Sequence, residues 1–453
     1  MPNYVKTDTY YSSATPPGHS AISIIRMSGP LCLKALCKIT KKARKKIIPR
    51  NAILTKLYSN NGHVIDMAVV TYYPAPFSYT GKDVVEISCH GSPVIVESVS
   101  LSLLKLGLRL STPGEFTRDA FLNGKLDLVQ AESVARLIQS KSQRAAEMNS
   151  RILQGDLTKK LFKIKECLVD ALSMVEFELD ISEEDIFRRG IKKHSLAKLK
   201  IAKEYCGSLI TSYNEGRMYN KGLRIAILGR PNVGKSTLFN AIIERDRAIT
   251  SKEPGTTRDT IDVSFSIGGI PVTLVDTAGI RESTDEIEKT GVERTMSEIK
   301  RCDLIVVLSE ADTESELQDS FSKVPTIKAI NKIDLLEKTK LSKLERTPNG
   351  QLFISALKKT GIGKLKDEIY KKINFTEKNT ADVFLTTQRQ FNSLLECGEN
   401  IDRAINLLAR GSMVFDIVSV DIKSAVASLD ILLGKTTADD ILNNIFKNFC
   451  VGK

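Results

Sequence analysis

A glycine-rich octapeptide, GRPNVGKS at residues 229–236, constrains the fold of this chain more than any other stretch. It matches the pattern GxxxxGK[ST], with an apolar run, LRIAIL, before it and a helix-like segment, KSTLFNAII, after it. Glycines in such a turn let backbone N–H groups converge on phosphate oxygens, and the N-terminus of the following helix adds partial positive charge. The order strand, tight turn, helix therefore predicts a phosphate-binding loop in an α/β domain.

Three further motifs follow in the order expected of a GTPase: DTAG at 276–279, NKID at 331–334 and SAL at 355–357. Lys235 would bring positive charge to the β- and γ-phosphates, while the Ser236 hydroxyl and Asp276 reach Mg²⁺. Asp334 can accept two hydrogen bonds from guanine, N1–H and the 2-amino group, and adenine lacks this edge. The sequence therefore predicts GTP binding by Asn232, Val233, Gly234, Lys235, Ser236, Thr237, Ser251, Lys252, Glu253, Pro254, Gly255, Thr256, Thr257, Asp276, Thr277, Ala278, Gly279, Asn331, Lys332, Asp334, Ser355, Ala356 and Leu357.

The position directly after DTAG lacks the glutamine with which small GTPases orient the attacking water. It holds Ile280, whose side chain cannot do so, and no arginine finger can be assigned in its place. Another group must therefore orient the water and neutralise the developing charge.

A chain of 453 residues is too long for one hydrophobic core, so several domains are expected. The pattern of strand-like and helix-like segments changes along the chain and suggests where these domains begin and end. We expect an N-terminal α+β domain at 1–120, a helical domain at 121–218 and 379–453, and an inserted Ras-like GTPase domain at 219–378, in all a multidomain α/β plus all-α protein. Within the insertion, LRIAIL, PVTLVDT, DLIVVL, TIKAIN and LFISA read as buried parallel strands. A predicted helix at 157–179 carries one apolar face, formed by Leu157, Leu161, Ile164, Leu168, Leu172, Val175 and Leu179.

Composition limits the class of protein and its compartment. Lys and Arg number 66 against 54 Asp and Glu, a net charge of +12, which suits a polyanionic partner such as RNA but also fits a lysine-rich genome. KKARKK at 41–46 is the densest basic run, a solvated loop or an RNA contact. Eight scattered cysteines without a CxxC pair favour a reducing cytosol. Since there is no secretory signal and no apolar run near 20 residues, we expect a cytoplasmic protein without membrane contact.

Four stretches, together with the GTPase motifs, carry a resemblance to a known family. They are TPPGHSAISIIRMSG (15–29), PGEFTRDAFLNGKLDLVQAE (113–132), PGTTRD (254–259) and FCVGK (449–453). On these the chain resembles, over essentially its whole length, the MnmE (TrmE) family of tRNA-modifying GTPases. The resemblance implies a K⁺-stimulated homodimer that works with an MnmG-like flavoprotein in a heterotetramer. It also implies an aminomethyl-type group added to carbon 5 of a tRNA wobble uridine, with a 5-formyl-tetrahydrofolate-type donor.

The resemblance also assigns residues to ligands. It implies K⁺ binding by Asn232, Ser251, Glu253 and Thr256, Mg²⁺ binding by Ser236 and Thr257, and folate binding by Arg26, Glu86, Lys125 and Lys453. Glu288 would orient the hydrolytic water, although by itself it reads as an ordinary exposed helix carboxylate. A GTP-switched ribosome-assembly or RNA-binding factor without one-carbon chemistry is the alternative function.

The terminal FCVGK has two interpretations. Upstream, TTADDILNNIFKNF predicts a helix with an early acidic pair and an apolar face of Ile441, Leu442, Ile445 and Phe446. Docking of this helix, with a last turn at Gly452, would place Cys450 and Lys453 at the folate pocket. Cys450 is then a nucleophile or a lining residue, and the sequence leaves this open. The alternative is a frayed end with an incidental cysteine.

Overall fold

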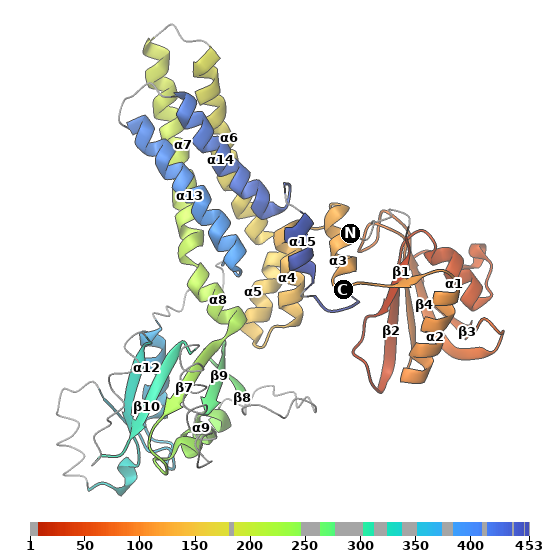
Figure 1. Ribbon diagram of the computed structural model, residues 1–453, viewed down its shortest axis with the longest axis horizontal. Helices are drawn as coiled ribbons and strands as arrows, with labels where there is room; N and C mark the ends of the chain where they lie inside the picture. The colour runs from red at the N-terminus through yellow and green to blue at the C-terminus, as the bar shows by residue number, and fades with distance from the viewer. Residues whose placement is uncertain are drawn as a thin grey trace, which may run out of the picture. The chain divides into compact units, whose positions relative to one another are not determined.

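The computed structural model describes residues 8–180, 185–245, 263–276, 302–311, 324–337, 351–373, 384–409, 415–436, 439–447 and 449–452. The chain divides into two compact units (Figure 1). Unit 1 comprises residues 1–139, 149–207 and 392–453, and unit 2 comprises residues 140–148 and 208–391. Unit 2 includes residues 219–378, where the inserted domain is expected, and also takes in 140–148, 208–218 and 379–391.

Unit 1 begins with a six-stranded sheet in the order β3-β4-β5-β2-β1-β6, and only the short pair β1–β6 is parallel. The strands are β1 (Tyr10–Ser13), β2 (Ser20–Ser28), β3 (Ile53–Tyr58), β4 (Val64–Tyr73), β5 (Val84–Gly91) and β6 (Arg109–Leu110). Side chains alternate between the two faces of such a sheet. Ile25 and Ile87 point into a core beneath helices α1 (Cys32–Thr40) and α2 (Pro93–Lys105). Their neighbours along the two strands, Arg26 and Glu86, lie on the opposite face of the sheet.

The rest of unit 1 is helical. It contains α3 (Glu115–Leu122), α4 (Leu128–Ile138), the end of α5 (Gln143–Leu153), α6 (Asp156–Asp180), most of α7 (Asp185–Thr211), most of α13 (Gln388–Ala409), α14 (Phe415–Leu433) and α15 (Asp439–Phe446). Among the described residues, no helix combines the length and apolarity needed to span a membrane.

The buried stripe of α6 differs from the predicted one in its second half. Leu172 is only half-buried and Leu179 is 39% exposed, while Ala171 and Glu178 are buried. The buried stripe therefore alternates steps of four and three residues throughout, a seven-residue repeat. The predicted face instead places Leu172 and Leu179 one residue too far along the helix. Such a repeat holds one seam against a neighbouring helix, and α14 is the helix that α6 packs against most extensively.

Unit 2 contains a second six-stranded sheet in the order β12-β11-β10-β7-β9-β8. Its strands are β7 (Leu223–Leu228), β8 (Val263–Ile267), β9 (Ile270–Asp276), β10 (Leu304–Ser309), β11 (Thr326–Ile330) and β12 (Leu352–Phe353), and its described helices include α8 (Tyr213–Lys221), α9 (Lys235–Arg245) and α12 (Ile362–Lys372). The five predicted parallel strands are confirmed. The antiparallel β8 was not predicted; the pair Gly268-Gly269, both at positive φ, turns it into β9.

Strand β7 is where the order of this sheet reverses, because the chain adds β9 and β8 on one side of β7 and β10 to β12 on the other. In open α/β sheets, ligands bind outside the carboxyl ends of the strands at such a switch point. The segment that follows β7 there is the glycine-rich loop 229–236.

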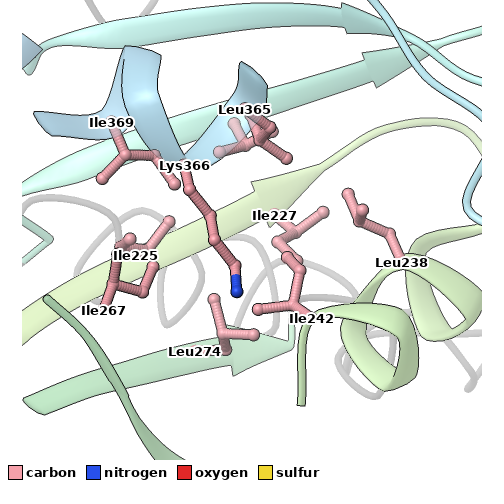
Figure 2. A pocket seen from close by; sticks show the side chains of 10 residues that line it. Ile225, Ile227, Leu238, Ile242, Ile267, Leu274, Leu365, Lys366 and Ile369 are labelled. Carbon is pink, nitrogen blue, oxygen red and sulfur yellow. The ribbon is translucent and has the colours of Figure 1, made fainter. Parts of the chain in front are cut away.

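The described residues of unit 2 line a small apolar hollow of about 10 Å³ (Figure 2). Ile225 and Leu274 of the sheet and Ile242 of α9 line it, and Lys366 reaches in from α12 with its nitrogen among these side chains. A space of this size holds about one water molecule. The hollow is a packing gap and not the nucleotide site.

Candidate functional site

The glycine-rich loop is wrapped around the side chain of Lys235. Its ammonium donates hydrogen bonds to the carbonyl oxygens of Gly229 (2.9 Å) and Arg230 (3.0 Å). Gly229 cannot be replaced easily, because a Cβ there would lie 2.5 Å from the carbonyl oxygen of Leu308 in β10. The loop therefore holds a cation where the phosphate groups of a nucleotide would bind.

Asn331, which follows β11, ties this loop to a distant segment of the chain. Its amide nitrogen donates to the carbonyl oxygen of Val233 (2.9 Å), and its amide oxygen accepts from the N–H of Ala356 (2.9 Å). Asn331 is 3% exposed, so both bonds are shielded from water. Gly234 passes so close that a Cβ would lie 2.4 Å from the Asn331 nitrogen. Three of the four predicted motifs thus meet through one buried side chain.

Asp334 lies on the short 3-10 turn η3 (Ile333–Leu335) and is exposed. The Ser355 hydroxyl donates to one of its carboxylate oxygens (2.5 Å) and accepts in turn from the N–H of Lys358 (3.1 Å). These two hydrogen bonds fix the orientation of the Asp334 carboxylate and leave it exposed to solvent. Leu357, beside it, is 70% exposed and offers an apolar surface for a base.

The other residues expected at the nucleotide divide into two groups. Asn232, at φ 62°, and both Ser236 and Thr237 on the first turn of α9 are exposed around the loop. The backbone of Asp276 ends β9 in register with Ile227 of β7. Lys332, which follows Asn331, adopts the left-handed conformation and pairs with Glu310 at 2.6 Å. Outside the described residues lie Ser251, Lys252, Glu253, Pro254, Gly255, Thr256, Thr257, Thr277, Ala278, Gly279 and Glu288.

In unit 1, two of the residues expected to bind folate form an ion pair. Arg26 and Glu86 are directly opposed on β2 and β5, and the Arg26 Nε and Nη2 atoms donate to Glu86 Oε1 at 2.9 and 2.7 Å. The guanidinium also lies 5.8 Å from the ring centroids of both Tyr79 and Phe116. The side chains of Arg26 and Glu86 are 18% and 26% exposed, so this site is recessed but open to solvent.

Residues that were not predicted complete this second site. The hydroxyls of Tyr79 and Thr117 lie 3.0 Å apart, and Tyr10 donates to Asp119 at 2.6 Å. Burial, followed by the nearby Asp119 carboxylate, raises the pKa of Tyr10, so its hydroxyl stays protonated. Lys82 also pairs with Asp119, at 2.7 Å. The stretch PGEFTRD at 113–119, which supplies Phe116, Thr117 and Asp119, carries no pattern that assigns these roles.

The chain terminus docks on unit 1, as the helix upstream of it predicted. Phe446 of α15 and Phe449 are buried against α4, and the N–H of Gly114 donates to the carbonyl oxygen of Cys450 (3.4 Å). At Gly452, φ is 94° and a Cβ would lie 2.4 Å from the carbonyl oxygen of Ser13. Ser13 follows Ser12, the register partner of Arg26, so the tail reaches the strand beside the Arg26–Glu86 pair.

The apolar face predicted for the terminal helix is only partly correct. The apolar face of α15 is confirmed for Leu442 and Phe446 and is wrong for Ile441, which is 39% exposed because the helix buries only the stripe that faces α3 and α4. Cys450 and Lys125 are exposed. Lys453 lies outside the described residues.

Comparison with known proteins identifies the family of the chain. Two family models match, "GTP-binding protein TrmE N-terminus" over residues 9–125 and "MnmE helical domain" over residues 128–450. Proteins named tRNA modification GTPase MnmE from Pseudothermotoga lettingae and Thermotoga maritima are each 38% identical, over 98% of this chain and 100% of their own length. The namesake from Aquifex aeolicus is 38% identical over 97% of this chain and 98% of its own. The chain therefore belongs to the MnmE (TrmE) family.

Proposed function

We propose that this protein hydrolyses GTP and, with an MnmG-like flavoprotein, installs an aminomethyl-type group at carbon 5 of the wobble uridine of certain tRNAs. The observation that carries the proposal is the buried Asn331, which joins the phosphate loop to the Asp334–Ser355 segment and so gives one site for phosphates and guanine. The tRNA modification is proposed from the full-length relatives, which are named tRNA modification GTPases.

The residues around the loop suit the ions that this function needs. Ser236 and Thr257 are the proposed Mg²⁺ ligands, and Asn232 leads the proposed K⁺ ligands, with Ser251, Glu253 and Thr256. The exposed Asn232 fits a hard cation, since its amide offers an uncharged oxygen. When bound, K⁺ would supply the positive charge that an arginine finger supplies elsewhere. Glu288 is the group proposed to orient water, in place of the missing glutamine.

The Arg26–Glu86 site fits a 5-formyl-tetrahydrofolate-type donor. Glu86 Oε2 takes no part in the pair with Arg26, so a carboxylate oxygen remains for the N–H donors of a pterin edge. Lys125 and Lys453 are proposed to hold the glutamate carboxylates of the ligand, and Cys450 lies on the tail docked beside the site. A cytoplasmic homodimer, joined to the flavoprotein as a heterotetramer, is the proposed assembly.

The nucleotide half of the proposal is tested by comparing GTP turnover in KCl and in NaCl at equal ionic strength. Because Ile280 cannot position water, we expect turnover to be much faster in K⁺, and Asn232→Ala should remove most of that difference. Equal turnover of the unmodified protein in the two salts would contradict the K⁺ assignment.

The one-carbon half separates the proposal from a ribosome-assembly factor. Calorimetric titration with 5-formyl-tetrahydrofolate should show binding that Glu86→Gln weakens, because the amide offers the pterin edge a weaker acceptor. Reconstitution with the flavoprotein, tRNA and folate, followed by nucleoside analysis, should then yield the modified uridine. Absence of both folate binding and modified nucleoside would favour the assembly factor.

A further inference from the structure

The segment from Met27 to Ile65 is the most unbalanced in charge in the N-terminal domain, because it holds nine Lys and Arg residues and no Asp or Glu. It supplies helix α1, the 3-10 turn η1 (Arg44–Lys46) and strand β3. Seven of the nine cations lie on α1 and the turn that follows it. Lys42 is half-buried, and the other six we call the α1 basic surface: Lys34, Lys38, Lys41, Arg44, Lys45 and Lys46.

All six of these side chains are exposed. Lys34 and Lys38 are one helical turn apart on the outer side of α1, whose inner side buries Leu36 and Ile39 in the sheet core. Lys41 ends the helix in the left-handed conformation and leads into η1, so the row of charges continues past the helix. Neighbouring cations on α1 are about 6 Å apart along the axis.

Carboxylates do not neutralise this surface. None of the ion pairs among the described residues includes any of the six cations. Asp66 on β4 and Asp83 just before β5 are engaged elsewhere, by the His90 ring nitrogen (2.7 Å) and the Ala75 N–H (2.9 Å). Charges of one sign on one surface repel one another and create a field that attracts a polyanion.

Local structure accounts for only two of the charges. Lys38 lies in the last turn of α1, where a cation complements the helix dipole. Lys41 lies 4.1 Å from the centroid of the Tyr58 ring, a cation–π contact. Lys34, Arg44, Lys45 and Lys46 have no comparable structural role among the described contacts.

We propose that the α1 basic surface binds the phosphodiester backbone of RNA, namely the tRNA substrate of the proposed function, on which this inference rests. A row of exposed cations can contact the phosphates of a nucleic acid and position it without reading its sequence. An anionic membrane fits less well, because a helix that lies on a bilayer inserts its apolar stripe, and that of α1 is already buried in the sheet core.

The test compares two quadruple variants that each remove four positive charges. The patch variant is Lys34→Gln, Lys38→Gln, Lys45→Gln, Lys46→Gln. The control is Lys159→Gln, Lys198→Gln, Lys203→Gln, Lys423→Gln, whose lysines each pair with a carboxylate at 3.2, 2.8, 2.5 and 2.9 Å. Binding of full-length protein to an unmodified tRNA transcript is followed by fluorescence anisotropy across a KCl series. All eight substituted lysines lie in unit 1, so an unchanged calorimetric unfolding transition of unit 1 shows that both variants are folded.

For the patch variant we expect at least a tenfold loss of tRNA affinity at low salt. The slope of log K against log salt should fall by about 3, since each phosphate contact contributes about 0.7 to 0.9. The control should stay within twofold of the unmodified protein. Undiminished affinity and slope in the patch variant would overturn the inference, as would a loss confined to phosphatidylserine vesicles. In either case the proposed function stands as long as the protein without substitutions still modifies tRNA. If that protein fails to modify tRNA, the proposed function is refuted.

Discussion

Asp334 is the single residue on which the choice of guanine over other bases should depend. Asp334→Asn replaces one acceptor oxygen by an amide donor, while Ser355 can still orient the side chain. A hydrogen bond to a charged group contributes about 1.5 to 3 kcal/mol, so GTP affinity should fall roughly tenfold to a hundredfold. Titration with fluorescent GDP and XDP measures this, and xanthine, whose 2-position carries an oxygen, should become the better ligand. Unchanged GDP binding would remove Asp334 from the base pocket.

Glu288, which lies outside the described residues, is predicted to orient the water that attacks GTP. If it orients the attacking water, Glu288→Ala removes an interaction made chiefly in the transition state. Turnover should fall strongly, while the Kd for GTP stays within about twofold of the unmodified protein, as single-turnover kinetics and equilibrium titration would measure. A parallel loss of affinity and turnover would instead mean that Glu288 supports the nucleotide-bound structure.

At the scale of elements, the chain terminus behaves as a docked segment anchored by α15. Gly452→Ala introduces a side chain at positive φ and places its Cβ against the carbonyl oxygen of Ser13. Such a residue costs about 1 to 3 kcal/mol, so the tail should undock, and hydrogen exchange at residues 449–452 should increase. The control Gly207→Ala lies in α7 with open space around it and should be neutral or slightly stabilising. A tail equally protected in Gly452→Ala would show that the contact with Ser13 does not hold it.

The same tail carries the exposed thiol of Cys450. We expect Cys450→Ser, or deletion of 450–453, to abolish tRNA modification in the two-protein reaction while K⁺-stimulated GTP turnover continues. A hydroxyl is a far weaker nucleophile than a thiolate at neutral pH. Cys167→Ser, a half-buried thiol of α6, is the matched control and should modify tRNA normally. Full modification by Cys450→Ser would assign the tail a purely structural part.

At the scale of the whole molecule, the two compact units have separate cores, and the predicted nucleotide site lies in only one. Calorimetry should resolve two unfolding transitions. GDP with Mg²⁺ at about 100 times its Kd stabilises a binding-competent unit by about 2.7 kcal/mol. The transition of unit 2 should therefore move to higher temperature while that of unit 1 stays in place. A single transition that shifts as a whole would contradict independent unfolding.

Much of unit 2 follows from the sequence because its signals are local. A strand, a glycine-rich turn and a helix that begins at Lys235 are decided by backbone preferences within about 20 residues. The five parallel strands could be predicted in the same way, because each is a short apolar run between helical patterns. The antiparallel β8 was missed although its sequence, VSFSI, alternates apolar and polar residues before Gly268-Gly269, a pattern that indicates a strand entering a hairpin.

The tertiary structure alone decided which distant residues meet. The pairing of Arg26 with Glu86 depends on strand register, and Phe116 of α3 meets Arg26 although 90 residues separate them in the sequence. The buried stripe of α6 keeps its seven-residue repeat because it must face α14 along its length, which the composition of α6 does not specify. Gly452 meets Ser13 across almost the whole chain. Periodicity reports which face of an element is apolar, but the partner of that face is selected by packing, whose free energy is shared among residues far apart in sequence.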